Sequence, residues 1–112
     1  MEITNARIKN VTVGLDNRDR LSASMTFEGP NFCRNCCFIL TDPTDVQRLV
    51  KLMLYTGTSE VQELNGKIIR RIDKNNFLRG FGDPIANKFI PIFGDELKEL
   101  TESQFEELLN TK

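Results

Sequence analysis

The sequence predicts an α+β fold, in which an antiparallel sheet of five to six strands carries one main helix packed across it and a short C-terminal helix. Two observations lead to this prediction. A stretch with helical periodicity occupies residues 42–57, with strand-like stretches on both sides, and strands do not alternate regularly with helices as in parallel sheets. At 112 residues the chain has the length of one domain, so residues 1–112 are expected to form a single domain.

The main helix is expected between Asp42 and Gly57. Asp42 suits the N-cap, Pro43 suits the first helical position, and Gly57 suits the left-handed residue that ends a helix. At about 100° per residue, the apolar residues share one face, which we expect to lie against the sheet. This face comprises Val46, Leu49, Val50, Met53 and Leu54, with Leu52 at its margin.

Three strands are expected before the helix. In residues 3–14 the apolar positions change parity, which predicts a bulge near Lys9–Asn10. Residues 21–28 alternate without error, so one face of that strand is expected to be wet. Its inward residues are Leu21, Ala23, Met25 and Phe27. The run Cys36–Leu40 is continuously apolar, which is typical of a strand covered on both faces.

Shorter elements are expected after the helix. A capping-box pattern at residues 59–62 predicts a single helical turn, and residues 67–73 and 77–81 read as two strands. Residues 88–93 resume an extended apolar run, and Pro91 places this strand at a sheet edge because proline cannot donate to a ladder. A second capping box, Thr101–Gln104, opens a short helix with Phe105, Leu108 and Leu109 as its apolar residues.

The chain contains no histidine. This absence removes the Ser-His-Asp triad, the Cys-His dyad and every His-ligated metal site. Three cysteines, Cys33, Cys36 and Cys37, lie within five residues. Zinc usually needs four ligands, so we expect no metal or other cofactor and interpret the thiols as small apolar residues entering a buried strand.

The same cysteines also indicate the cellular compartment in which the protein is expected. An odd, clustered set is poorly suited to a disulfide framework, and the first ten residues contain no apolar signal core. No apolar run has the length needed to cross a membrane. We therefore expect a cytoplasmic protein with reduced thiols and no membrane partner.

The most informative loop reads Gly80-Phe81-Gly82-Asp83-Pro84. Two glycines allow a backbone to approach a ligand closely, and an aromatic residue between them is placed to stack on a ring. Asn87 and Lys88 add a polar group and a charge. A bulged turn without a ligand is the alternative interpretation. We expect Phe81 to be at least partly exposed, because other phenylalanines are available for the core.

Basic residues gather on the neighbouring strands. Residues 67–90 carry six Lys/Arg against two Asp/Glu, whereas residues 91–112 carry two against six. Arg70, Arg71 and Arg79 could hold phosphate or nucleic acid, or the charges could be solvated or paired internally, with the acidic stretch 95–107 folded over them. Because Arg70 and Arg71 are adjacent in a strand, one is expected to face solvent and the other to lie near the apolar side.

Carboxylates offer a further possibility, since metal-dependent hydrolysis does not require histidine. Asp73 and Asp83 flank the strand expected at residues 77–81 and lie at opposite ends of it if it is straight. That separation argues against a shared Mg²⁺ ion, so a small metal-dependent enzyme using Asp83 is the weakest of the alternatives.

Short motifs in this chain resemble small proteins of bacteriophages and prophages, most of them without an assigned function. The residues concerned are Ala6-x-Ile8-x-x-Val11-x-Val13-Gly14-Leu15-Asp16, a strand ending near Phe27, Leu64-x-Gly66-Lys67-x-Ile69-Arg70, and Gly80-Phe81-Gly82. The resemblance spans residues 6–90 and implies a phage accessory protein that acts by binding a host component. This chain departs from the group at residues 33–37, where the group is rich in glycine and aromatic residues, so no role is carried over to the cysteines.

Our leading hypothesis is a non-catalytic phage or prophage accessory protein in the cytoplasm of a bacterial host. It would bind a host protein or a small signalling ligand and so counter host antiviral defence. The alternatives are a nucleic-acid-binding protein that uses the basic strands of residues 67–90, and the metal-dependent enzyme. The residues expected to form the binding site are Arg70, Arg71, Arg79, Phe81, Asp83, Asn87 and Lys88, and no catalytic or metal-binding residue is expected.

Overall fold

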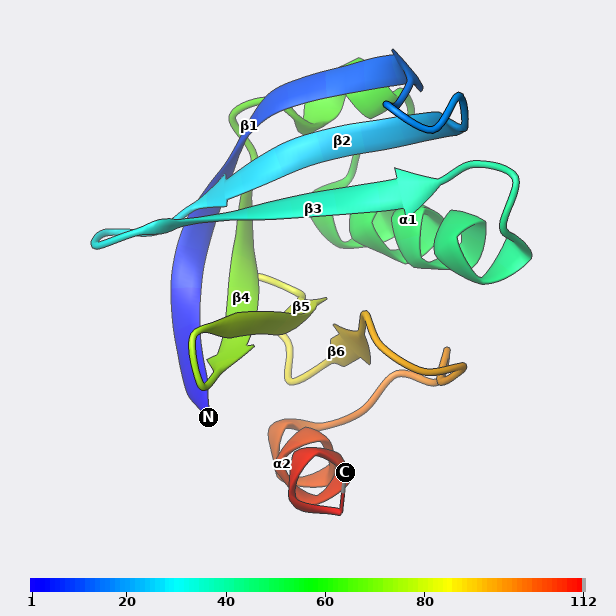
Figure 1. Ribbon diagram of the computed structural model, residues 1–112. Coiled ribbons are helices and arrows are strands. Elements are labelled where there is room, and N and C mark those ends of the chain that lie inside the picture. Colours follow the sequence, from blue (N-terminus) through cyan, green and yellow to red (C-terminus); the bar gives the residue numbers. More distant parts are fainter. Residues whose placement is uncertain (112) are drawn as a thin grey trace.

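The computed structural model describes residues 1–111 and contains a six-stranded antiparallel sheet with one main helix and a short C-terminal helix (Figure 1). The strand order is β3-β2-β1-β4-β5-β6, and every neighbouring pair is antiparallel. The predicted α+β class is therefore confirmed. The elements are β1 (Glu2–Leu15), β2 (Leu21–Glu28), β3 (Cys33–Ile39), α1 (Pro43–Thr56), the 3₁₀ helix η1 (Val61–Leu64), β4 (Ile68–Lys74), β5 (Phe77–Gly82), β6 (Phe89–Pro91) and α2 (Glu102–Asn110).

The long strand β1 joins the two halves of the sheet. Residues 2–7 pair with β4 and residues 7–15 pair with β2. The register shifts between Lys9 and Thr12, and Asn10 adopts a φ of 56°, so the predicted bulge is confirmed. The extra residue lets both Ile8 and Val11 be buried despite their opposite parity, and the sheet curls around this point.

The strand β3 differs from its prediction, because it is covered on only one face. Cys36 and Phe38 are buried, whereas Cys37 between them is exposed. β3 lies at one edge of the sheet, and α1 packs against its inner face alone (Figure 1). The opposite edge is β6, as expected from Pro91.

Helix α1 begins and ends as predicted. The side chain of Asp42 accepts a hydrogen bond from the backbone N–H of Thr44, and Gly57 adopts a φ of 69°. Its apolar face is rotated relative to the prediction. Leu52 is fully buried with Leu49, whereas Val50 is 43% and Leu54 is 66% exposed.

The cause of this rotation is Arg48, which is buried on the inner face of α1. Its guanidinium donates to the carbonyl oxygens of Phe93 and Gly94 at 3.1 and 2.7 Å and to the carboxylate of Asp45 at 3.4 Å. A helical wheel counts arginine as polar, but here its aliphatic stem lies in the interior because its charged end has partners. Half-buried Met53 lies at the margin of the buried face.

Two apolar clusters lie on opposite faces of β4, β5 and β6. The main cluster lies between the sheet and α1, and it contains the largest share of buried side chains. The second lies under α2 and consists of Ile72, Phe89, Phe105 and Leu109. Thr101 and Gln104 form the predicted capping box of α2. Figure 1 shows α1 and α2 on either side of β5 and β6. Within residues 1–111, no helix is both long enough and apolar enough to span a membrane.

Candidate binding site at the β5–β6 loop

The residues predicted to bind a ligand or partner do not form one continuous site. Four of them meet in and around the loop of residues 83–88, between β5 and β6, whereas three lie elsewhere. The four at the loop are Arg70, Asp83, Asn87 and Lys88, and the three elsewhere are Arg71, Arg79 and Phe81.

Asp83 closes the loop from inside. Its Oδ1 accepts hydrogen bonds from the backbone N–H groups of Ile85 and Ala86 at 2.8 and 2.9 Å. Its own N–H donates to the carbonyl of Lys88 at 3.0 Å. The hydrogen bonds from Ala86 and Ile85, with smaller effects of the nearby charges of Lys88 and Arg70, hold the pKa of Asp83 below its usual value. The aspartate therefore works as a turn residue.

Arg70 clamps the same loop from β4. Its Nε donates to the carbonyl of Asp83 at 2.7 Å, and its Nη2 donates to the carbonyl of Ala86. The guanidinium lies 4.8 Å from the centre of the Phe89 ring, within the range of a cation–π contact. Arg70 is the arginine on the side away from the main cluster, but its charged end is engaged with the loop.

Asn87 fastens the loop to the next element. Its Oδ1 accepts a 2.7 Å hydrogen bond from the backbone N–H of Glu102, the first residue of α2. Lys88, the neighbouring residue, is exposed. The loop is thus connected to β4 through Arg70 and to α2 through Asn87.

The side chain that this loop presents is Ile85, which is 91% exposed. Within residues 1–111, no other large apolar side chain is so open to solvent. Ile85 is not among the residues that the sequence predicts for the binding site, although Asn87 and Lys88 of the same loop are. A local signal was available, because Asp83 followed by Pro84 predicts a turn, and connecting segments run over the protein surface.

Phe81 is fully buried, so the expectation that it is partly exposed was wrong. Its ring makes edge-to-face contacts with Phe38 and Tyr55, at centroid distances of 6.3 and 6.1 Å. The glycines on either side of Phe81 allow close packing in the protein interior. A Cβ at Gly80 would lie 2.6 Å from the carbonyl oxygen of Ile90 and 2.6 Å from the Phe105 ring, so its missing side chain makes room for β6 and α2.

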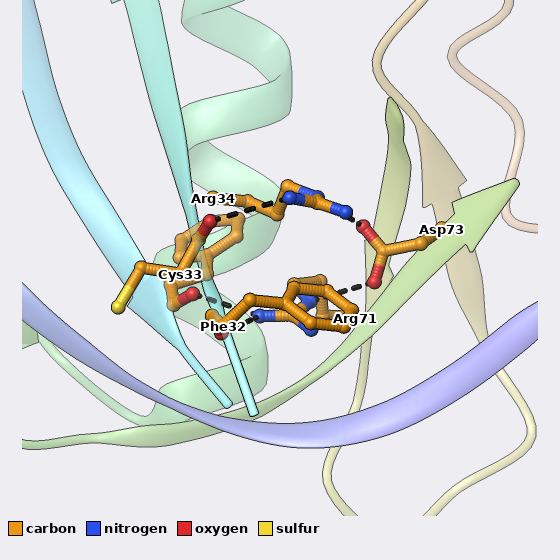
Figure 2. A network of polar contacts seen from close by, with 6 residues as sticks. Phe32, Cys33, Arg34, Arg71 and Asp73 are labelled. Carbon is orange, nitrogen blue, oxygen red and sulfur yellow. Dashed lines mark hydrogen bonds and ion pairs between the residues drawn. The ribbon is translucent and has the colours of Figure 1, made fainter. Parts of the chain in front are cut away.

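Arg71 is also buried, with 1% of its surface exposed, and it belongs to a polar network in the interior (Figure 2). Its Nε donates to Asp73 at 2.7 Å, and its Nη1 donates to the carbonyls of Phe27 and Phe32, each at 3.0 Å. Arg34 donates to the other oxygen of Asp73 at 3.2 Å. Figure 2 shows Arg34 and Arg71 directed toward the same carboxylate from two elements.

The ring of Phe32 lies against both arginines of this network. The guanidinium carbons of Arg34 and Arg71 are 4.2 and 4.5 Å from its centre. Because Arg71 is buried, it cannot contribute to a basic surface on β4. The carboxylate of Asp73 pairs with both Arg34 and Arg71. The expectation that one of the two adjacent arginines lies toward the interior is confirmed.

Arg79 lies apart from the loop. Its guanidinium is 5.8 Å from the centres of the Phe77 and Phe93 rings. Part of the acidic stretch does lie over the basic strands, because α2 packs on Ile72 of β4 and Phe89 of β6. Within residues 1–111, however, the ion pairs found for Arg70, Arg71 and Arg79 include no carboxylate from residues 95–107. Instead, Glu99 pairs with Lys51 at 3.6 Å and accepts a 2.6 Å hydrogen bond from Tyr55.

The cysteines are free thiols with different surroundings. Cys33 and Cys37 are exposed, whereas Cys36 is buried, and burial raises the pKa of the Cys36 thiol. Within residues 1–111, the structure brings no three His, Cys, Asp or Glu side chains together in a group that could hold a metal ion.

No family model matches the chain, and neither a curated protein nor a solved structure is significantly similar to it.

Proposed function

We propose that this chain is a non-catalytic accessory protein of a phage or prophage that binds a host protein through the loop of residues 83–88. The observation that carries this proposal is the exposure of Ile85 on a loop whose backbone is held by Asp83 and Arg70. A solvated isoleucine is unfavourable in isolation, and burying it against a partner recovers that free energy.

The hydrogen bonds of the loop favour binding by reducing its entropic cost. A loop that is already ordered loses little conformational freedom when a partner closes over it. Asp83 and Arg70 bond to backbone groups on both sides of Ile85, so its main chain has a defined position before any contact forms. An apolar side chain in a fixed position is typical of an anchor residue at a protein interface.

The shape of the site favours a protein over a small molecule as the partner. Small ligands are bound in concave pockets that enclose most of their surface. Ile85 is 91% exposed and so stands out from the surface, which suits insertion into a groove on another protein. Binding of a small signalling ligand at this loop is accordingly the less favoured form of the hypothesis.

Charged residues flank this apolar contact within the loop, since Asp83 precedes Ile85 and the exposed Lys88 follows it. A polar rim of this kind around an apolar centre is the usual arrangement of protein interfaces. The resemblance to phage proteins supports a host partner, and inhibition of host antiviral defence is the biological role that we propose for the binding.

The proposal is tested by affinity purification from the bacterial host with quantitative mass spectrometry of proteins and small molecules. Ile85→Asp should lose the captured protein, because the substitution places a charge at the contact. Leu15→Asp is the matched control, since Leu15 is 70% exposed on a different hairpin, and it should retain the protein.

Nuclease treatment and a salt series separate this function from nucleic-acid binding. Loss of the captured material after nuclease treatment would indicate nucleic acid as the ligand. A steep fall of capture with increasing salt, in the wild type and in both variants, would indicate the same. Capture of the same protein by Ile85→Asp at the wild-type level would refute the role of the loop.

A further inference from the structure

The two edges of the sheet differ in how they are protected from pairing with another strand. The β6 edge is three residues long, ends at Pro91, and forms a bridge from Phe89 to Leu100. The β3 edge is seven residues long and contains no proline, lysine or bulge. Its only charged residue, Arg34, is turned inward to Asp73. Edge strands usually carry such protection, so an unprotected edge of this length is suited to strand addition.

The hydrogen bonds between β2 and β3 define which backbone groups of β3 are free. The N–H of Leu40 donates to Leu21, and the N–H of Gly29 donates to Phe32. Because bonded pairs alternate in an antiparallel ladder, the even-numbered residues of β3 bond to β2 and the odd-numbered residues point away from it.

The chain itself uses the last of these outward residues. The N–H of Ile39 donates to the carboxylate of Asp45 at 2.9 Å, and its carbonyl accepts from the N–H of Asp42 at 3.1 Å. The carbonyl of Cys33 receives only a long 3.5 Å contact from Arg34. As far as residues 1–111 are concerned, free main-chain groups thus remain at Cys33, Asn35 and Cys37, spaced evenly along the edge.

We propose that β3 pairs with β3 of a second copy of this chain, antiparallel and about a two-fold axis at Asn35. In this register Asn35 lies opposite the partner's Asn35, and Cys33 lies opposite the partner's Cys37. The three outward residues of each copy then form about six main-chain hydrogen bonds across the axis. The same set of residues is used on both sides, as a two-fold interface requires.

The side chains at this edge also fit a second copy. None of the three outward residues is charged, so two copies do not repel each other along the contact. The Oδ1 of Asn35 accepts from Thr26 at 3.2 Å, which leaves its amide N–H groups free to donate across the axis. The dimer contact uses residues of β3, whereas the loop of residues 83–88 lies between β5 and β6, so substitutions test the two surfaces separately and each proposal can fail without the other.

The oligomeric state under reducing conditions tests the interface. Light scattering coupled to size exclusion should show a dimer for the wild type and for Asn35→Ala, which keeps the backbone N–H. Asn35→Pro should be monomeric, because it removes an outward N–H while leaving the bonds to β2 intact. A wild type that is monomeric up to millimolar concentration, or a folded Asn35→Pro that remains dimeric, would overturn the proposal.

Thiol crosslinking tests the register without depending on the proline variant. Opposed residues in a bonded pair have Cα atoms about 5.5 Å apart, within the range that a disulfide spans. Diamide is the oxidant: it accepts the two electrons and two protons that two thiols release, and becomes the hydrazine. Cys33→Ser and Cys37→Ser should each fail to crosslink alone, whereas their equimolar mixture should form a covalent dimer through Cys37 of one copy and the partner's Cys33. A mixture that forms no dimer, or a single variant that crosslinks with itself as well as the mixture does, would overturn this register.

Discussion

The Nε of Arg71 donates a 2.7 Å hydrogen bond to the carboxylate of Asp73, two residues further along β4, in the interior of the protein. Arg34 approaches the second carboxylate oxygen, so two positive charges share one negative charge. Removing one partner from a buried network leaves an uncompensated charge, which costs far more than breaking a surface pair.

Asp73→Asn should therefore lower the free energy of unfolding by about 3 kcal/mol. Glu28→Gln is the control, because the pair of Glu28 with Lys9 is about half exposed, at 41% and 46%, and its loss should cost less than about 1 kcal/mol. Urea unfolding of both variants measures the difference. Equal midpoints for the two would show that the network does not stabilise the interior.

The inner face of α1 leads to a second prediction. Leu52→Ala should destabilise the protein by about 2–5 kcal/mol, since Leu52 is fully buried in the main cluster. Leu54→Ala is the matched control, because it also removes a leucine side chain, but at a position that is 66% exposed. Its free energy of unfolding should stay within about 0.5 kcal/mol of the wild-type value. If thermal unfolding ranks these variants in the opposite order, the face that α1 turns toward the sheet is not the one described.

The position of Phe81 leads to a third prediction. Phe81→Ala should lower the free energy of unfolding by about 3–5 kcal/mol, because the ring is enclosed by Phe38 and Tyr55. Phe77→Ala, at a ring that is 64% exposed at the start of the same strand, serves as the control and should have a much smaller effect. Chemical denaturation measures both variants. A Phe81→Ala variant as stable as the wild type would contradict the burial of this ring and support a role for Phe81 in binding a partner.

The pKa of Asp83 makes the closure of the loop dependent on pH. Its folded-state value lies below the usual 3.8, so the stabilisation is present above that value and is lost as the pH falls through the folded-state pKa. In an NMR titration from about pH 6 to about pH 2, the amide signals of Ile85 and Ala86 should shift with a midpoint below the usual range for aspartate. Asp83→Asn keeps an acceptor oxygen that does not titrate, and should abolish the shift. A midpoint at or above the ordinary value would indicate that the carboxylate does not hold the loop.

Features of the fold that depend on local chemistry were predictable from the sequence. Asp42 and Gly57 mark the ends of α1, Pro91 marks an edge strand, and the parity change in β1 marks its bulge. The face of α1 was not predictable in the same way. Arg48 lies inside only because the carbonyls of residues 93 and 94, far away in the sequence, accept its hydrogen bonds.

The candidate site was predictable only in part for the same reason. Asp83 and Pro84 indicate a turn from local sequence alone, and the structure places a turn there. Whether Phe81 or Ile85 faces solvent depends on the register of β5 against β4 and on the packing of α1 and α2 on the two faces of the sheet. Those contacts link residues far apart in the chain, so the local sequence does not show that Gly80 makes room for Phe105 and Gly82 for Phe89.

Photocrosslinking in the host cell identifies the surface of this protein that touches a partner. A photoreactive benzoylphenylalanine is introduced in place of Ile85, and in parallel in place of Leu15, which is also strongly exposed. After irradiation of cells that produce each variant, we expect a discrete covalent adduct with one host protein from position 85 and none from position 15. An adduct from position 15 alone, or no adduct from position 85, would contradict the assignment of residues 83–88 as the binding loop.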